Sequence, residues 1–71
     1  MKKFGEKLRV LRKQRGLTLR QLAAILGMKA HSHLSYIETG KNNPTADLIL
    51  GIADYFNVSL DQLMRDELEL E

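Results

Sequence analysis

Two histidines, His31 and His33, are the side chains best suited to metal binding or acid–base chemistry in this sequence. Residues two apart on a helix point about 200° away from each other, so the two imidazoles cannot share one metal ion. No third ligand lies nearby in the sequence, and the chain contains no cysteine. Most carboxylates lie in the other half of the chain, away from both histidines. We therefore expect no catalytic residue, no metal site, no cofactor and no enzymatic activity.

Basic and acidic residues are separated along the chain. Residues 1–41 contain ten Lys and Arg against two acids, whereas residues 42–71 contain one Arg against seven acids, so the halves carry +8 and −6. A strongly basic half indicates a polyanionic partner, and the acidic half argues against uniform nonspecific binding. The alternative is that the two halves are simply solvated faces of opposite charge.

The composition is typical of one small globular domain. The chain has 71 residues, of which 44% are hydrophobic and 28% charged, with a single proline. No apolar run is long enough for a membrane-spanning helix or for the core of a signal peptide, so we expect a cytoplasmic protein that binds no membrane. A chain of this size has little core to spare for a deep pocket, and no small-molecule ligand is expected.

Helical periodicity dominates the sequence, and no alternating apolar pattern of a strand occurs. Thr18 with Gln21, and Ser59 with Gln62, have the spacing of capping boxes, and Thr45 is a further helix N-cap. The start of the third helix is weakly signalled. The predicted helices cover about residues 2–15, Leu19 to Gly27, Met28–Thr39, Thr45 to Asn57 and Ser59 to Met64, with stops at Gly16, Gly27, Gly40 and Asn57.

Each predicted helix has an apolar face. Lys and Arg around the first helix are expected to form mostly a solvated face. The expected core residues are Phe4, Leu8, Leu11, Leu22, Ala23, Ile25, Leu26, Leu34, Ile37, Ile49, Ile52, Ala53, Phe56 and Leu63. Two short helices joined by a glycine-containing turn are typical of a helix-turn-helix, whose second helix enters the major groove of DNA.

Three blocks of sequence resemble one known family. They are LRKQRGLTLRQLAAILG at 11–27, LSYIETGKNNPT at 34–45 and IADYFNVSLDQL at 52–63. In this order they resemble the phage-repressor type (Cro/C1-like, XRE-like) helix-turn-helix transcriptional regulators, over nearly the whole chain. The resemblance implies an all-α, five-helix repressor-like DNA-binding domain with the helix-turn-helix formed by helices 2 and 3. Residues 1–71 would be a single domain, with about 64–71 as a C-terminal extension or tail.

The resemblance also implies roles for individual residues. The base-reading candidates are His31, Ser32 and Tyr36, with His33 and Ser35 nearby. The phosphate-contacting candidates are Thr18, Arg20, Lys29, Lys41, Asn42 and Asn43. An imidazole N–H can donate to guanine N7 or O6, whereas a serine hydroxyl discriminates little. The alternatives are that the histidines are merely solvated and that Tyr36 packs partly against helix 2.

The chain departs from the family pattern in three ways. Leu19 stands where the family usually has glutamine, and Arg20 is the expected substitute. One extra residue lies in Met28-Lys29-Ala30, and Ala30, a poor N-cap, aligns with the family's Ser or Thr. The register of the helix 3 start therefore stays open. Arg12 and Glu38 match an arginine of helix 1 and a glutamate near the end of helix 3 that pair in the family, and we expect a largely buried, bidentate ion pair between them.

The resemblance predicts a sequence-specific regulator of transcription, acting as a dimeric repressor on double-stranded DNA. The alternative is an antitoxin or restriction-modification controller protein that acts partly by binding a partner protein, with the acidic segment from Asp66 to Glu71 as the docking site. Apolar residues outside the predicted core suggest a homodimer interface, unless they are ordinary exposed side chains. The interface candidates are Leu48, Gly51, Tyr55, Leu60, Met64 and Leu68.

Overall fold

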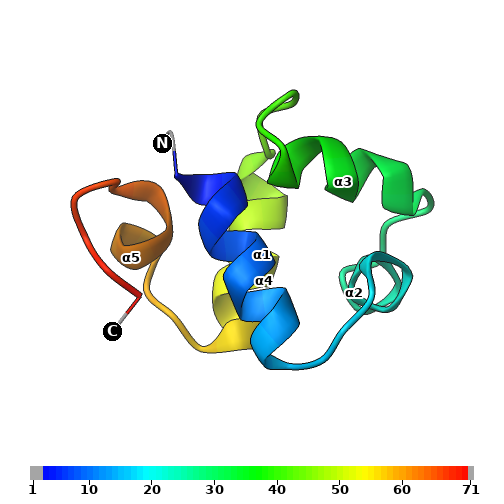
Figure 1. The fold of residues 1–71 in the computed structure, drawn as a ribbon, viewed down its shortest axis with the longest axis horizontal. Coiled ribbons are helices and arrows are strands. Elements are labelled where there is room, and N and C mark those ends of the chain that lie inside the picture. The colour runs from blue at the N-terminus through cyan, green and yellow to red at the C-terminus, as the bar shows by residue number, and fades with distance from the viewer. Residues whose placement is uncertain (1–2, 71) are drawn as a thin grey trace.

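The computed structural model describes residues 3–70. In chain order these residues form α1 (Phe4–Gln14), α2 (Leu19–Ile25), α3 (His31–Glu38), α4 (Ala46–Phe56) and α5 (Leu60–Met64). The helices α1 and α4 lie in the middle, with α2 and α3 at one end and α5 at the other (Figure 1). The predicted all-α, five-helix fold is confirmed, since residues 3–70 contain no strand. No helix in this range is long and apolar enough to cross a membrane.

Local sequence sets most helix ends as predicted. Both capping boxes are present: Thr18 Oγ1 accepts the Gln21 N–H at 3.1 Å, and Ser59 Oγ accepts the Gln62 N–H at 3.0 Å. Asn57 ends α4 in the left-handed conformation with φ 56°. The start of α3 differs, because Ala30 makes no side-chain hydrogen bond to the helix and the helix begins only at His31.

Lys7 of α1 is buried, so the expectation that the basic residues of this helix are solvated is wrong for this side chain. It is 7% exposed, and its ammonium donates to the carbonyls of Gln62, Arg65 and Leu68 at 2.5, 2.8 and 2.7 Å. These carbonyls lie in the last part of α5 and just beyond it, where carbonyls lack intrahelical partners and attract a cation. Lys7 therefore fastens α5 to α1.

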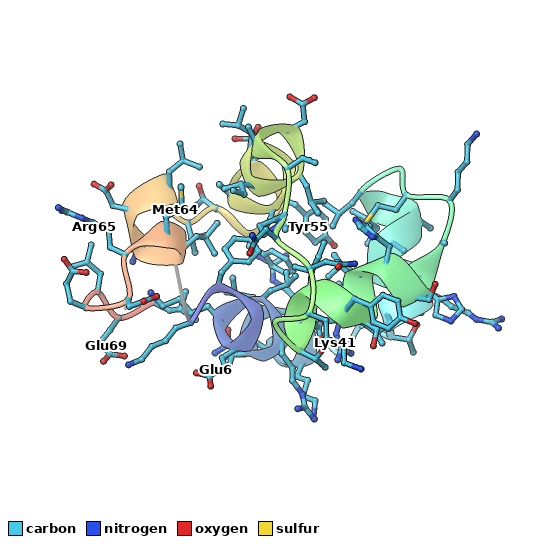
Figure 2. All side chains as sticks on the ribbon, turned by 90° about the horizontal axis from the view of Figure 1, so that it is seen from above. Glu6, Lys41, Tyr55, Met64, Arg65 and Glu69 are labelled. Carbon is cyan, nitrogen blue, oxygen red and sulfur yellow. The ribbon has the colours of Figure 1, made fainter. Side chains whose placement is uncertain are left out.

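The segment after α5, expected to be a tail, folds back over α1. Gln62 Nε2 donates to the carbonyl of Leu70 at 2.8 Å, and the Leu70 side chain packs against the core. The Lys3 backbone N–H donates to the carboxylate of Asp66 at 2.8 Å. As a result Glu69 and Glu6 line the same hollow beside α1 (Figure 2). Residues 65–70 are thus part of the packed domain.

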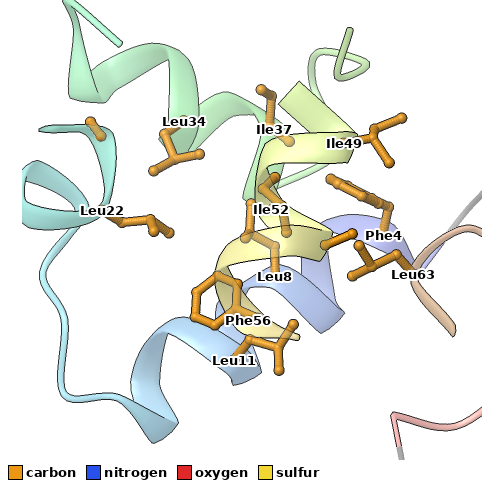
Figure 3. Packing of buried hydrophobic residues seen from close by; sticks show 12 residues of the cluster. Phe4, Leu8, Leu11, Leu22, Leu34, Ile37, Ile49, Ile52, Phe56 and Leu63 are labelled. Carbon is orange, nitrogen blue, oxygen red and sulfur yellow. The ribbon is translucent and has the colours of Figure 1, made fainter. Parts of the chain in front are cut away.

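The core lies where α1, α3, α4 and α5 meet, and α2 adds Leu22 and Ala23 (Figure 3). Every predicted core residue is buried except Ile25, the last residue of α2, and its C-cap Leu26, which packs against the core. Ile25 is 44% exposed and Leu26 is half-buried. In a helix of two turns the inward direction is fixed by Leu22 and Ala23, and Ile25 lies about 110° from that direction at 100° per residue. The apolar face predicted for this helix was therefore too wide.

Gly5 sets how closely α1 approaches α3. A Cβ atom at this position would lie 2.5 Å from the carbonyl oxygens of both Ile37 and Glu38, the last residues of α3. Only glycine fits there without a shift of backbone. The first turn of α1 therefore packs directly on the backbone at the C-terminal end of α3.

Arg12 of α1 and Glu38 of α3 form the ion pair expected from the sequence. Arg12 Nε lies 2.7 Å from Glu38 Oε2, and Nη2 lies 3.1 Å from Oε1, so the contact is bidentate. The two side chains are only 12% and 6% exposed. Arg12 Nη1 also donates to the carbonyl of Leu17 at 2.8 Å, in the turn before α2. One guanidinium therefore joins α1, the following turn and α3.

Removing one member of this pair should lower the free energy of unfolding by about 3–5 kcal/mol, because the remaining charge is buried without a partner. We expect this loss for Arg12→Met and for Glu38→Leu. The double variant should be nearly as stable as the wild type, because its two apolar side chains can pack together. Urea denaturation followed by circular dichroism measures all three.

The exposed pair of Arg65 and Glu67, with Nε and Oε2 3.8 Å apart, is the matched control. Arg65→Met should cost less than about 1 kcal/mol. An equal loss at the two pairs, or a double variant less stable than either single variant, would contradict the account of the Arg12–Glu38 pair.

Candidate nucleic-acid interface

The helix α3 has one buried and one exposed face. Leu34 and Ile37 are buried in the core. Helical spacing places Ser32, Tyr36 and Thr39 on the opposite side, and all three are exposed. This outer face, defined by Ser32, Tyr36 and Thr39, carries three hydroxyls, one of them on an aromatic ring, that a ligand can reach.

The other three predicted base-reading residues lie on the flanks of α3. His31 is exposed in the first turn, directly after the uncapped start of the helix. Ser35 is half-buried beside Leu19. His33 lies on the flank that faces α4, where it lines a small hollow together with Leu26, Met28, Thr45, Asp47 and Leu48. Of the five residues, Ser32 and Tyr36 are therefore the ones on the outer face.

The loop after α3 is bonded to the helix through Tyr36. The backbone N–H groups of Lys41 and Asn42 both donate to the Tyr36 carbonyl, at 2.8 and 3.2 Å. Thr39 Oγ1 donates to the same carbonyl at 3.2 Å. Lys41, Asn42 and Asn43 are exposed, and the Lys41 side chain lies close to α3 (Figure 2). The structure thus holds three predicted phosphate-contacting residues next to the outer face.

The start of α2 supplies further predicted phosphate-contacting residues. Thr18 is engaged in its capping box, where its N–H donates to Gln21 Oε1 at 2.8 Å and its oxygen accepts. The Thr18 hydroxyl hydrogen is the part of this side chain that can still donate to a phosphate. Arg20 and Lys29 are exposed. Leu19, which replaces the family's glutamine, packs against the core instead.

Two residues at this surface were missed by the sequence analysis. Thr39 follows Ser32 by seven positions and Tyr36 by three, so helical spacing alone could have placed it on the outer face. Arg9 of α1 is exposed and lines a hollow with Leu19, Ser35 and Thr39. Arg9 lies three residues before Arg12 and therefore on a neighbouring face of α1. This spacing could have indicated that Arg9 lies near the end of α3.

The charge separation along the sequence becomes a separation in space. The exposed cations Arg9, Arg20, Lys29 and Lys41 lie on α1, α2, the α2–α3 turn and the loop after α3. Exposed carboxylates on α5 and the segment after it, Asp61, Glu67 and Glu69, lie at the other end of the molecule (Figure 1), whereas Asp47 at the start of α4 lines a hollow with His33 of α3. The surface around the outer face of α3 is therefore basic, as a polyanion-binding surface requires.

Comparisons with known proteins agree with this geometry. A helix-turn-helix family model matches residues 8–63. The HTH-type transcriptional repressor RghR of Bacillus subtilis is 40% identical over 65 residues, which cover 90% of this chain and 47% of RghR. The chain spans about half the length of two of the curated relatives that it matches, RghR among them.

Two solved structures have the same fold. The N-terminal DNA-binding domain of SinR from Bacillus subtilis matches with a TM-score of 0.83 and 28% identity, over 97% of this chain and 100% of that chain. The restriction-modification controller protein C.AhdI from Aeromonas hydrophila matches with a TM-score of 0.77 and 32% identity, over 89% and 94% of the two chains. The chain therefore belongs to the Cro/C1-type (XRE-like) helix-turn-helix family of DNA-binding transcriptional regulators, which are not enzymes.

Proposed function

We propose that this protein is a sequence-specific repressor that binds double-stranded DNA as a homodimer, with α3 of each copy in the major groove. The observation that carries the proposal is the outer face of α3, which is exposed, polar and bonded to a cationic loop. An α-helix fits the major groove, where each base pair presents a distinct pattern of donors and acceptors. A dimer on promoter DNA would repress by blocking access to it.

Base contacts and phosphate contacts divide between two parts of this surface. Ser32, Tyr36 and the first-turn His31 are placed to reach base edges, with His31 as the donor able to select guanine. Ser35 and His33 lie on the flanks of α3, and we expect them to contribute less to base contacts. Phosphate contacts supply affinity and orientation without sequence information. For them we propose Thr18, Arg20, Lys29, Lys41, Asn42 and Asn43.

The homodimer interface predicted from sequence needs revision. Leu48 packs against the core, and a Cβ at Gly51 would contact the Leu26 side chain at 3.8 Å, so both positions face α2 rather than a free surface. Tyr55 packs edge-on against Phe56, with the Arg15 guanidinium 5.5 Å from its ring centroid. Leu48 and Gly51 are therefore half-buried within the monomer, whereas Tyr55 is 36% exposed and stays a candidate for the interface.

Leu60 and Met64 remain as the centre of the proposed interface. They are one helical turn apart on the same face of α5 and are 41% and 40% exposed. Leu68 and Leu50 are further exposed apolar side chains in this half of the chain. A small domain gains stability by covering such a surface. A two-fold axis beside α5 would place the two copies of α3 on successive turns of DNA, roughly 34 Å apart.

A controller or antitoxin role is the alternative, and the fold shared with C.AhdI is compatible with it. That role would add a partner protein at the acidic C-terminal segment. Leu70 of this segment packs against the core, which leaves the exposed side chains of Leu68, Glu67 and Glu69 for such a partner. We prefer DNA-binding repression because the α3 surface alone accounts for it.

Substitutions on α3 and in the following loop should have different effects on DNA binding. Selection from random duplexes first supplies the preferred site, and fluorescence anisotropy over a range of salt concentrations then compares the variants. His31→Ala should reduce discrimination at particular base pairs by about 1–3 kcal/mol, and Ser32→Ala should reduce it by less, because a serine hydroxyl discriminates little. Lys41→Ala should weaken all duplexes alike and lower the salt slope by about one unit.

Arg65→Ala is the matched control, because Arg65 is an exposed cation at the α5 end (Figure 2) and should leave the salt slope unchanged. The docking arrangement is wrong if Lys41→Ala alters sequence preference while neither Ser32→Ala nor His31→Ala does.

Charged substitutions on α5 should dissociate the dimer. Sedimentation equilibrium at micromolar concentration should show a dimer for the wild type and a monomer for Leu60→Asp/Met64→Asp, because two carboxylates cannot be buried unpaired against a second copy. Val10→Asp is the control, since Val10 on α1 is 45% exposed and lies outside the proposed interface. A monomeric wild type, or a dimer that survives the double substitution, would remove this interface.

A further inference from the structure

Tyr36 and Lys41 contact each other through both backbone and side chains. Through the backbone, the Tyr36 carbonyl accepts the Lys41 N–H at 2.8 Å, which fixes where the loop leaves α3. Through the side chains, the Lys41 ammonium lies over the Tyr36 ring, 5.7 Å from its centroid. Both side chains are exposed, so the contact is at the surface beside the outer face of α3. The residue on the helix and the cation in the loop therefore form one unit.

We infer that Tyr36 is a positioning residue for the phosphate contact of Lys41, in addition to any contact that its own ring makes with DNA. The ring holds the ammonium beside α3, where a phosphate that flanks the major groove would lie when the helix is docked. The inference rests on the proposed DNA-binding function. It identifies the flanking phosphate as the ligand of the combined Tyr36–Lys41 unit.

Tyr36 should favour the phosphate contact of Lys41 because it restricts the conformational freedom of the lysine side chain before DNA binds. A free lysine has a long flexible stem and loses that freedom when its ammonium binds one phosphate. An ammonium already held over an aromatic face has lost part of the freedom beforehand, and the phosphate can still reach its remaining N–H donors. Exposed cation–π contacts are weak, so we expect an effect of about two- to fivefold on affinity.

The ring, rather than the phenol oxygen, should carry this effect. Tyr36→Phe keeps the aromatic face and should therefore lose less affinity for an unrelated duplex than Tyr36→Leu does. Tyr36→Leu removes the face, keeps the backbone hydrogen bonds and should weaken binding to the same duplex by about two- to fivefold. An unrelated duplex is the right probe, because it reports phosphate contacts and not base reading.

A double-mutant cycle tests whether the contributions of Tyr36 and Lys41 to duplex binding depend on each other. Binding of Tyr36→Leu, Lys41→Ala and the double variant to the unrelated duplex is measured by fluorescence anisotropy at several salt concentrations. We expect Tyr36→Leu to have no further effect once Lys41 is alanine, because the ring then has no cation to hold. The same fold loss in both backgrounds, or a loss confined to the selected site, would overturn the inference.

A second measurement needs no DNA. Proton NMR of the free protein should show the Lys41 side-chain methylene resonances shifted upfield by the ring current in the wild type and in Tyr36→Phe, but not in Tyr36→Leu. Absence of the shift in the wild type would overturn the side-chain contact. A wild-type protein that binds no duplex at any salt concentration would overturn the proposed function itself. Additive losses of affinity in the double-mutant cycle would instead overturn only the coupling between Tyr36 and Lys41.

Discussion

The guanidinium of Arg12 is the constraint on which the position of α3 depends. It donates hydrogen bonds to both carboxylate oxygens of Glu38 and to the carbonyl of Leu17. These bonds fix the positions of α1, the turn before α2 and the end of α3 relative to one another. Gly5 adds a second fixed point, because α1 packs on the backbone of the same α3 residues. With α3 held from behind at its C-terminal end, Ser32, Tyr36 and Thr39 must point outward. The exposed row proposed to read DNA is thus a consequence of contacts on the buried side.

Two cations within the fold join segments that a small apolar core alone would hold weakly. Arg12 connects α1 to α3, and Lys7 connects α1 to α5 and the residues after it. A buried charge stabilises a fold only when its hydrogen-bonding groups have partners. That condition is met, since no buried side-chain nitrogen or oxygen lacks a hydrogen bond in residues 3–70. The helix α1 is therefore the element to which both ends of the domain are attached.

Features set by nearby residues could be predicted from the sequence, and features set by tertiary contacts could not. The capping boxes at Thr18 and Ser59 and the left-handed Asn57 depend on a few neighbouring residues, and all were predicted correctly. The Arg12–Glu38 pair was found through the family resemblance. The burial of Lys7 and the inward direction of Leu48 depend on segments far away in the chain. For the site, sequence placed the residues on α3 and its loop, but only the structure showed the contact between Tyr36 and Lys41.

We propose that α3 and the loop bonded to it form the DNA-binding face. This proposal can be tested by titrating ¹⁵N-labelled protein with a duplex containing the selected site and following the amide chemical shifts. We expect the largest changes on residues 31–36 and 41–43 and on the start of α2, while α5 changes little apart from any dimer contact. Changes concentrated on α5 and residues 65–70, with α3 unaffected, would contradict it.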